Sequence, residues 1–239
     1  KDGNIPNSPP IITVAKPEDR ARLAVIQKDL AAARAKVAAR KKEAKRDFEA
    51  WLKTAKPEQV AGKVPTDNLQ LHAPLIEGEG KTTKATVLDA EQNLNLGDGY
   101  NWRLERAGKK TFTIRAGPAI EFSNLGDFDK DQPFAVSAWV QISKRGTNGS
   151  LVARMDEGNG HRGWDVRIQA DRVGFHLINT WPENALKVVA KEPLKPGKWY
   201  HVAVAYDGSA KASGVKIYLD GEPQPVDTEA DALKSTTKA

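Results

Sequence analysis

Residues 195–221 read KPGKWYHVAVAYDGSAKASGVKIYLDG, and this stretch decides the fold. In its first half, Tyr200, Val202 and Val204 alternate with His201 and Ala203. In its second half, Val, Ile and Leu stand at every second position from 215 to 219. Such an alternation of β-branched and aromatic residues predicts a strand. A Pro-Gly pair at 196–197 and Asp-Gly pairs at 207–208 and 220–221 predict turns at the strand ends. The stretch therefore predicts two strands joined by a loop.

Short runs of the same kind fill much of the chain around this hairpin. We expect further strands at 111–114, 119–122, 134–142, 150–155, 164–169, 172–178 and 186–190, after an opening strand within 69–75. No helical pattern separates these runs, so the sequence predicts an antiparallel β-sandwich of the jelly-roll type. In the strand at 134–142, Val136 and Val140 share one face and Trp139 lies on the other. We nevertheless expect Trp139 in the core.

Several of these runs resemble a known family. WYHVAVAYDG at 199–208 and VKIYLDG at 215–221 are similar to the hairpin of laminin-G-like, concanavalin A-like lectin/glucanase domains, and AIEF at 119–122 with QPFAVSAWV at 132–140 resembles a second landmark. The runs ARMD, RGWD, FHLINTWP and NALKV within 153–188 resemble the laminin-G-like module of planctomycete-type cytochrome-c-linked proteins. This resemblance implies a module of a large exported bacterial protein, an extracytoplasmic location, and a haem site outside this chain.

The end of the chain departs from the family pattern. The resemblance implies a closing strand of the form G-x-[IL]-D-[DE]-[VI]-R-[IV]-Y after Gly221, and residues 222–239 do not contain it. We therefore expect a sandwich that is incomplete at its C-terminus and leaves an apolar edge exposed, which favours aggregation.

The N-terminal quarter has a different pattern. We expect an extended, proline-containing linker at 1–16, one long basic amphipathic helix at 17–56, a second linker at 57–68, and the sandwich at 69–239. Along the helix, apolar residues recur every seven positions, as in a coiled coil: Leu23, Leu30, Val37, Ala44 and Trp51. So narrow a stripe requires a partner helix. We expect that partner elsewhere in the parent protein, and the alternative is another chain.

Composition excludes several classes of protein. The 239 residues contain no cysteine, which rules out disulfides and thiolate metal sites in this chain. Residues 1–64 hold 15 Lys and Arg against 8 Asp and Glu, a balance of +7, so most of the net charge of +6 belongs to the helix. We interpret the run RKKEAKR at 40–46 as the solvated face of that helix, with polyanion binding as the alternative, and expect no nucleic-acid partner. No apolar run is long enough for a membrane span.

Catalytic patterns are missing as well. A glucanase of this fold needs two carboxylates that face one cleft, so they stand two or four residues apart on a strand, and no strand has that pattern. The adjacent pair Asp156 and Glu157 would point to opposite faces. His176 and His201 lie in apolar strands, where we interpret them as packing residues. The sequence thus predicts no enzymatic activity in this chain.

One acidic loop is a candidate metal site. Asp127, Asp129 and Asp131 alternate in GDFDKD, and Ca²⁺ prefers clustered carboxylate and carbonyl oxygens. The resemblance also implies a Ca²⁺ loop, since laminin-G-like relatives often hold this ion. The alternative is a solvated turn before the next strand. Asp156, near Asn159, is a weaker candidate.

A sugar site is the remaining possibility. Lectin sites stack an aromatic ring on the sugar and add amide or carboxylate hydrogen bonds, and the candidates are Trp164, Asn179, Trp181 and Asn184. The alternative for both tryptophans is a place in the core, which we favour for Trp164. The sequence predicts a non-enzymatic module that recognises a carbohydrate or a protein. A structural spacer between catalytic or electron-transfer domains is the alternative, and exposure of Trp181 beside Asn179 and Asn184 would favour recognition.

Overall fold

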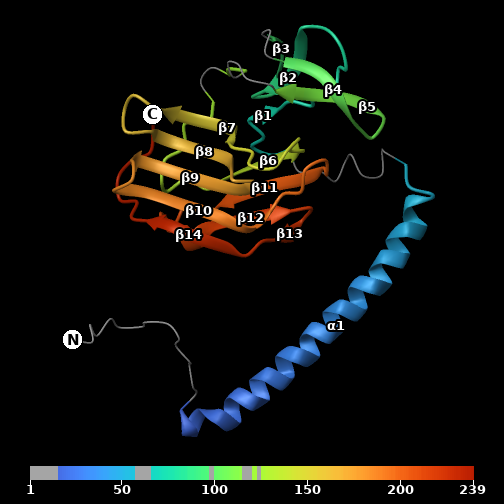
Figure 1. Ribbon diagram of the computed structural model, residues 1–239, viewed down its shortest axis with the longest axis vertical. Coiled ribbons are helices and arrows are strands. Elements are labelled where there is room, and N and C mark those ends of the chain that lie inside the picture. Colours follow the sequence, from blue (N-terminus) through green and yellow to red (C-terminus); the bar gives the residue numbers. More distant parts are fainter. Residues whose placement is uncertain (1–15, 57–65, 97–99, 115–119, 123–124) are drawn as a thin grey trace. The chain divides into compact units, whose positions relative to one another are not determined.

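The computed structural model describes residues 16–56, 66–96, 100–114, 120–122 and 125–239 (Figure 1). The chain divides into two compact units, Lys1–Asp67 and Asn68–Ala239, and each is described by itself. Residues 1–15 of the expected linker at 1–16 and residues 57–65 of that at 57–68 lie outside the described part of the chain.

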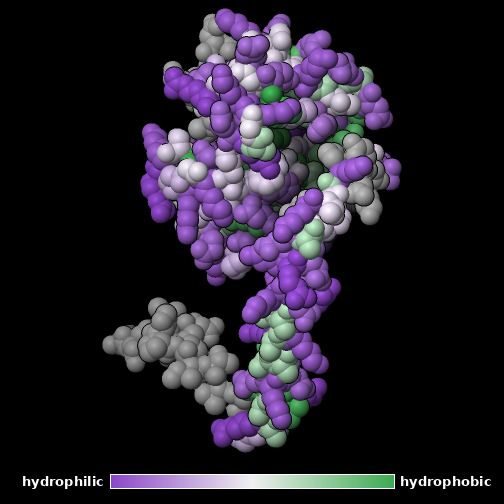
Figure 2. Space-filling view, turned by 90° about the vertical axis from the view of Figure 1, so that its right-hand side faces the viewer, coloured by the Kyte–Doolittle hydropathy of each residue, from purple (hydrophilic) through white to green (hydrophobic). Residues whose placement is uncertain are grey.

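The first unit contains one long helix. A 3₁₀ turn, η1 (Pro17–Asp19), leads into α1 (Arg20–Leu52), so the helix ends four residues before the predicted position 56. The side chains of the predicted stripe are largely exposed: 40% for Leu23, 47% for Leu30 and 56% for Val37. Figure 2 shows apolar side chains at the surface of the helix among hydrophilic ones. Among the described residues of this unit, no contact buries the stripe. A partner helix packed on these apolar side chains would bury them.

Five antiparallel strands form the larger sheet of the second unit. Its order is β14-β10-β9-β8-β7, and all neighbours pair antiparallel (Figure 1). The strands are β7 (Gly149–Asp156), β8 (Arg162–Gln169), β9 (Arg172–Thr180), β10 (Asn184–Pro193) and β14 (Val226–Asp231). Trp164, Val166 and Ile168 of β8 point to the core side, because they are buried at alternate positions there.

A four-stranded sheet of order β13-β12-β11-β6 covers the inner face of the first. It consists of β6 (Phe134–Val140), β11 (Tyr200–Tyr206), β12 (Val215–Leu219) and β13 (Glu222–Pro223), and the short turn η2 (Ala212–Gly214) precedes β12. Burial alternates strictly along β11, so the predicted hairpin at 195–221 is confirmed. Phe134 of β6 stacks between the sheets, with ring centroids 5.1 Å from Trp164 and 6.0 Å from Phe175. The two apolar faces thus form one core, and the predicted β-sandwich is confirmed.

Two small sheets precede the sandwich. One has the order β1-β2-β3, from β1 (Leu71–His72), β2 (Thr82–Val87) and β3 (Ala90–Asn95); the other pairs β4 (Tyr100–Arg106) with β5 (Lys109–Ile114). The β4–β5 hairpin lies beside the four-stranded sheet. The indole N–H of Trp199, the residue before β11, donates to the carbonyl of Glu105 in β4 at 3.1 Å. The sequence analysis placed no strands at β2, β3, β4, β13 and β14, and their polar sequences explain the omission. The expected strand at 119–122 is wrong for residues 120–122, which are irregular; residue 119 lies outside the described part.

The edge of the five-stranded sheet differs from the expected one. After Gly221 the chain forms β13 and then β14, which pairs with β10. The sequence of β14 is VDTEAD, so the outermost strand on this side is polar and acidic rather than apolar. Carboxylates on an edge strand discourage pairing with another chain. The incompleteness of the sandwich itself stays a prediction.

The position of Trp139 corrects the sequence analysis. The predicted alternation along β6 is confirmed, but only the face with Val136 and Val140 meets the core. Trp139 lies on the other face, where 48% of it is exposed and the Arg106 guanidinium lies 3.3 Å from its ring centroid. A residue on the outer face of a two-layer sandwich cannot reach the core, whatever its hydrophobicity.

No helix among the described residues has the length and apolar character that a membrane crossing needs.

The two tryptophans offer a test of this arrangement. Trp164→Ala removes a buried ring and should lower the free energy of unfolding by about 3–5 kcal/mol. Trp139→Ala removes a half-exposed ring and one cation–π contact, and should cost no more than about 1.5 kcal/mol. Urea unfolding of the two variants measures the difference. Equal losses would contradict the assignment of Trp139 to the outer face.

Candidate functional site

The outer face of the five-stranded sheet carries a group of interacting polar side chains. Here, outer face means the residues of β7 to β10 and β14 that point away from the four-stranded sheet. Several of them are nonetheless buried: Asp165, His176, Ile178, Ala185 and Val189 are each at most 6% exposed, and none belongs to the core cluster between the sheets. Long side chains therefore lie flat over this face and form a second, partly polar layer.

A buried acid–base pair lies at the centre of this layer. Asp165 of β8 and His176 of β9 are opposite each other in the sheet, and Nδ1 of His176 lies 2.7 Å from Oδ1 of Asp165. The Ser150 hydroxyl of β7 donates to the other carboxylate oxygen at 3.0 Å. A buried carboxylate needs such partners, since an unpaired one would be costly. The arrangement fixes the orientation of the imidazole ring.

The same three residue types occur in hydrolases, but in another order. In a Ser-His-Asp relay the serine hydroxyl bonds to the histidine, which removes its proton. Here Ser150 bonds to Asp165, and in the described part of the chain it forms no hydrogen bond with His176. The geometry therefore orients His176 and does not activate Ser150.

Trp181 covers this pair from the loop between β9 and β10. Its ring packs edge-to-face on His176, with centroids 5.3 Å apart, and the Lys187 ammonium lies 5.5 Å from its centroid. The side chain is half-buried, so part of the indole ring remains in contact with solvent. An aromatic ring held in place by polar neighbours is the kind of surface on which sugars stack.

Ion pairs line the β10–β14 side of the outer face. Lys187 and Glu229 are joined at 2.7 Å, and Asp227 lies 3.4 Å from Arg172 and 3.3 Å from Lys191. The hydrogen bond from Lys187 is the main cause that lowers the pKa of Glu229 below its usual range. These pairs engage Asp227 and Glu229 of β14.

The predicted sugar-binding residues separate into three environments. Trp164 is only 4% exposed and donates its indole N–H to the Gly126 carbonyl at 2.7 Å, so it belongs to the core, the alternative that the sequence analysis favoured. Trp181 lies on the outer face. Among the described residues, Asn179 and Asn184 form no hydrogen bond with either ring; instead they hold the C-terminal segment 233–239, which we define as the tail.

Both asparagines have their amide groups engaged by the tail. Asn179 donates to the Thr236 carbonyl at 2.7 Å, and Asn184 accepts from the backbone N–H of Lys234 at 2.7 Å. The two asparagines also bond to each other at 3.3 Å. Leu233 anchors the start of the tail in the core at 5% exposure. The asparagines thus act as clamps for the chain in this structure.

The tail also engages two of the three predicted metal ligands. Asp129 accepts hydrogen bonds from the Thr236 hydroxyl at 2.9 Å and the Thr237 N–H at 3.1 Å, and Asp127 accepts from the Ala239 N–H at 3.0 Å. Burial would raise the pKa of Asp129, but together these bonds and that from the Lys130 N–H outweigh it and lower the pKa. Asp131 is exposed.

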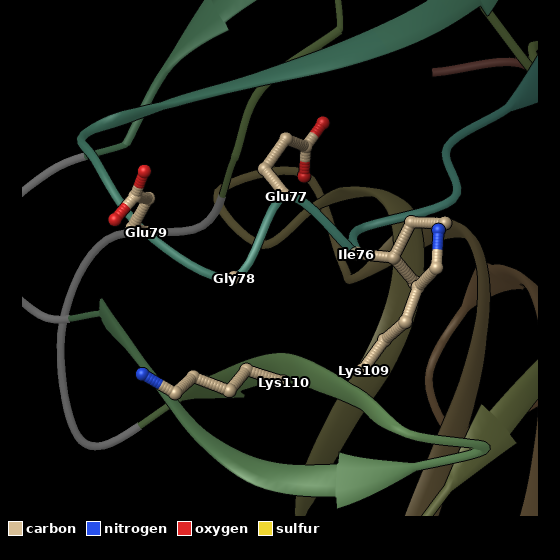
Figure 3. A pocket seen from close by; sticks show the side chains of 6 residues that line it. All are labelled: Ile76, Glu77, Gly78, Glu79, Lys109 and Lys110. Carbon is tan, nitrogen blue, oxygen red and sulfur yellow. The ribbon is translucent and has the colours of Figure 1, made fainter.

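Within the described part of the chain, no three His, Asp or Glu side chains come together as a metal site. A shallow, open depression lies in the small sheets instead, where Figure 3 shows the segment 76–79 on one side and Lys109 and Lys110 on the other. One of its acids, Glu77, is already bonded to the Thr83 hydroxyl at 2.8 Å and to the Lys84 N–H at 2.8 Å. We therefore place the candidate site on the outer face.

The sequence analysis did not identify the polar residues of the outer face as a group. Their signal was present: Asp165, Arg167 and Gln169 are polar positions at period two in a strand whose other positions are apolar. Only the pairing of β8 with β9, and of β9 with β10, shows that His176 and Lys187 share a row with Asp165.

Comparison with known proteins relates the sandwich to a family. The family model described as the concanavalin A-like lectin/glucanases superfamily matches residues 114–239, which comprise the sandwich strands from β6 to β14. No curated protein matches the chain.

The clamp on the tail can be tested at Asp129. Asp129→Ala leaves the Thr236 and Thr237 donors without their acceptor, and should lower the free energy of unfolding by about 1–3 kcal/mol and abolish the exchange protection of the Thr237 amide. Asp131→Ala, in the same loop, should change neither. Hydrogen exchange and urea unfolding measure both effects. Retained protection in Asp129→Ala would contradict the clamp.

The same carboxylate makes the clamp dependent on pH. Because its folded-state pKa is lowered, its stabilisation is complete above the unfolded-state pKa of about 3.9 and is lost as the pH falls through the lower folded-state value. The protection factor of the Thr237 amide, which is corrected for the intrinsic pH dependence of exchange, should therefore fall as the pH drops below about 4. In Asp129→Ala this pH-dependent fall should be absent.

Proposed function

The chain belongs to the concanavalin A-like lectin/glucanases superfamily, and from this premise we propose that it is a non-enzymatic recognition module that binds a carbohydrate on the outer face of its five-stranded sheet. Modules of this family serve as carbohydrate- or protein-binding domains. The observation that carries the proposal is the half-buried Trp181 ring, fixed on the Asp165–His176 pair. A pre-oriented aromatic ring binds a sugar face with little loss of side-chain entropy.

The polar surroundings of Trp181 support a carbohydrate as the ligand. Lys187 lies beside the ring, and Glu229, bonded to Lys187 and to Gln169, supplies acceptor oxygens nearby. A sugar needs such donors and acceptors around an aromatic platform. A protein ligand is the second possibility for the same face, and we place the location outside the cytoplasm. The setting within a cytochrome-c-linked parent protein stays a prediction.

A structural spacer is the other candidate function, and the exposed stripe of α1 favours it. Leu30 and Val37 expose 47% and 56% of their surface, and Phe48 stacks on Trp51 at 5.6 Å without further cover among the described residues. In this reading the helix packs on another helix of the parent protein. The partner could instead be a helix of a second copy of this chain, which sedimentation of the wild type and of Leu30→Glu tests. Self-association of the wild type that the variant abolishes would identify a second copy as the partner.

Calcium binding at Asp127, Asp129 and Asp131 also stays a proposal. An ion there would compete with the tail for two of the three carboxylates. A Ca²⁺-dependent rise in Tm that is lost in Asp131→Ala would support the site, because a ligand of the native state stabilises it.

The recognition proposal is tested with a matched pair of tryptophans. Trp181→Ala should weaken binding to the polysaccharides that the chain retains in affinity electrophoresis by about tenfold or more, since the loss of one stacked ring costs roughly 1–3 kcal/mol. Trp139→Ala removes a solvent-accessible tryptophan from the opposite sheet and should leave binding unchanged. If Trp139→Ala is the variant that loses binding, the ligand lies on the four-stranded sheet and the proposal fails.

A further inference from the structure

Arg167 is a cation on the outer face of β8, and none of the described acidic side chains forms an ion pair with it. The acids of this face are all engaged by bases: Asp165 by His176, Glu229 by Lys187, and Asp227 by Arg172 and Lys191. In the described part of the chain, Arg167 forms no ion pair, and its Nε atom is buried without an acceptor. A half-buried guanidinium whose charge no neighbouring acid balances is suited to bind a carboxylate of a ligand.

The sheet holds Arg167 in a defined position. It stands opposite Ser150 of β7 and Gly174 of β9. A Cβ atom at Gly174 would lie 3.6 Å from Cγ of Arg167, so the arginine stem passes over the place that glycine leaves open. Packing of the stem on the sheet limits its conformational freedom, and less entropy is lost when the guanidinium binds a ligand.

The spacing of Arg167 and Trp181 on the outer face indicates what kind of ligand fits. Arg167 and Asp165 are two residues apart on one strand, a separation of about 7 Å. His176, on which Trp181 packs, stands opposite Asp165. The aromatic ring and the guanidinium therefore belong to adjacent rows of the same face, close enough for neighbouring units of one extended chain.

We propose that the ligand of this face is an acidic polysaccharide, with a carboxylate bound by Arg167 next to the sugar that Trp181 stacks. The proposal rests on the proposed function and narrows its ligand to a uronic-acid glycan. The planar guanidinium can form paired hydrogen bonds with a carboxylate, which would balance the charge that no acid of this face pairs with. An acidic peptide offers the same carboxylates but no ring-shaped apolar face for Trp181.

The test uses the full chain and three soluble probes. These are polygalacturonate, its methyl ester, which has the same sugars without charge, and poly-glutamate. Titration calorimetry compares the wild type with Arg167→Gln and Arg167→Lys. Lys216→Gln is the matched control, because it removes one positive charge from an exposed position of the four-stranded sheet.

We expect the wild type to bind polygalacturonate at least tenfold more tightly than either other probe. Arg167→Gln should lose that preference, Arg167→Lys should lose part of it because the ammonium cannot form the paired bonds, and Lys216→Gln should keep it. Three results would overturn the inference: an equal loss in Arg167→Gln and Lys216→Gln, poly-glutamate binding as tight as polygalacturonate binding, or no binding of polygalacturonate. Binding of the neutral ester that depends on Trp181 but not on Arg167 would overturn it as well and leave the proposed function standing.

Discussion

The contact between the inner faces of the two sheets is the constraint on which the rest of the structure depends. Val166, Phe175 and Val188 of one sheet and Val204 and Ile217 of the other are each at most 3% exposed. Because side chains alternate along a strand, this contact fixes every other residue on an outer face. As a result, Trp164 points into the core and Trp139 points away from it, and Asp165, Arg167 and His176 lie together on the outer face of the five-stranded sheet. The polar chemistry of the module follows from the packing of its core.

Polar residues at the facing ends of β9 and β10 and in the loop before β6 serve the fold in this structure. The asparagines at 179 and 184 and the aspartates at 127 and 129 hold the tail through hydrogen bonds that span 50 to 112 positions of sequence. The same residue types in loops are typical of lectin and calcium sites, which is why the sequence pattern favours both interpretations. To distinguish a structural role from a ligand-binding role, one must know where the tail lies. The position of the tail depends on how the two sheets pack, which the sequence pattern does not give.

The sequence predicts the parts that obey a period of two. β6 to β12 lie within two to three residues of their expected bounds, since each combines β-branched residues with turn pairs at its ends. β2, β3 and β14 escape prediction because their sequences, such as TTKATV and VDTEAD, are mostly polar. The family resemblance covers the same part of the chain that is predictable from pattern. The outer face is predictable only in part: its polar positions are visible, but their neighbours across strands are set by register.

The central claim is that ligands meet the outer face of the five-stranded sheet at Trp181. The most direct measurement is an NMR titration with a fragment of a polysaccharide that the chain binds. It follows the indole N–H signals of the six tryptophans as the fragment is added. The account predicts that the Trp181 indole and the His176 ring signals shift together and saturate, while those of Trp139 and Trp164 stay in place. Shifts centred on Trp139 and His201, with Trp181 unchanged, would contradict it.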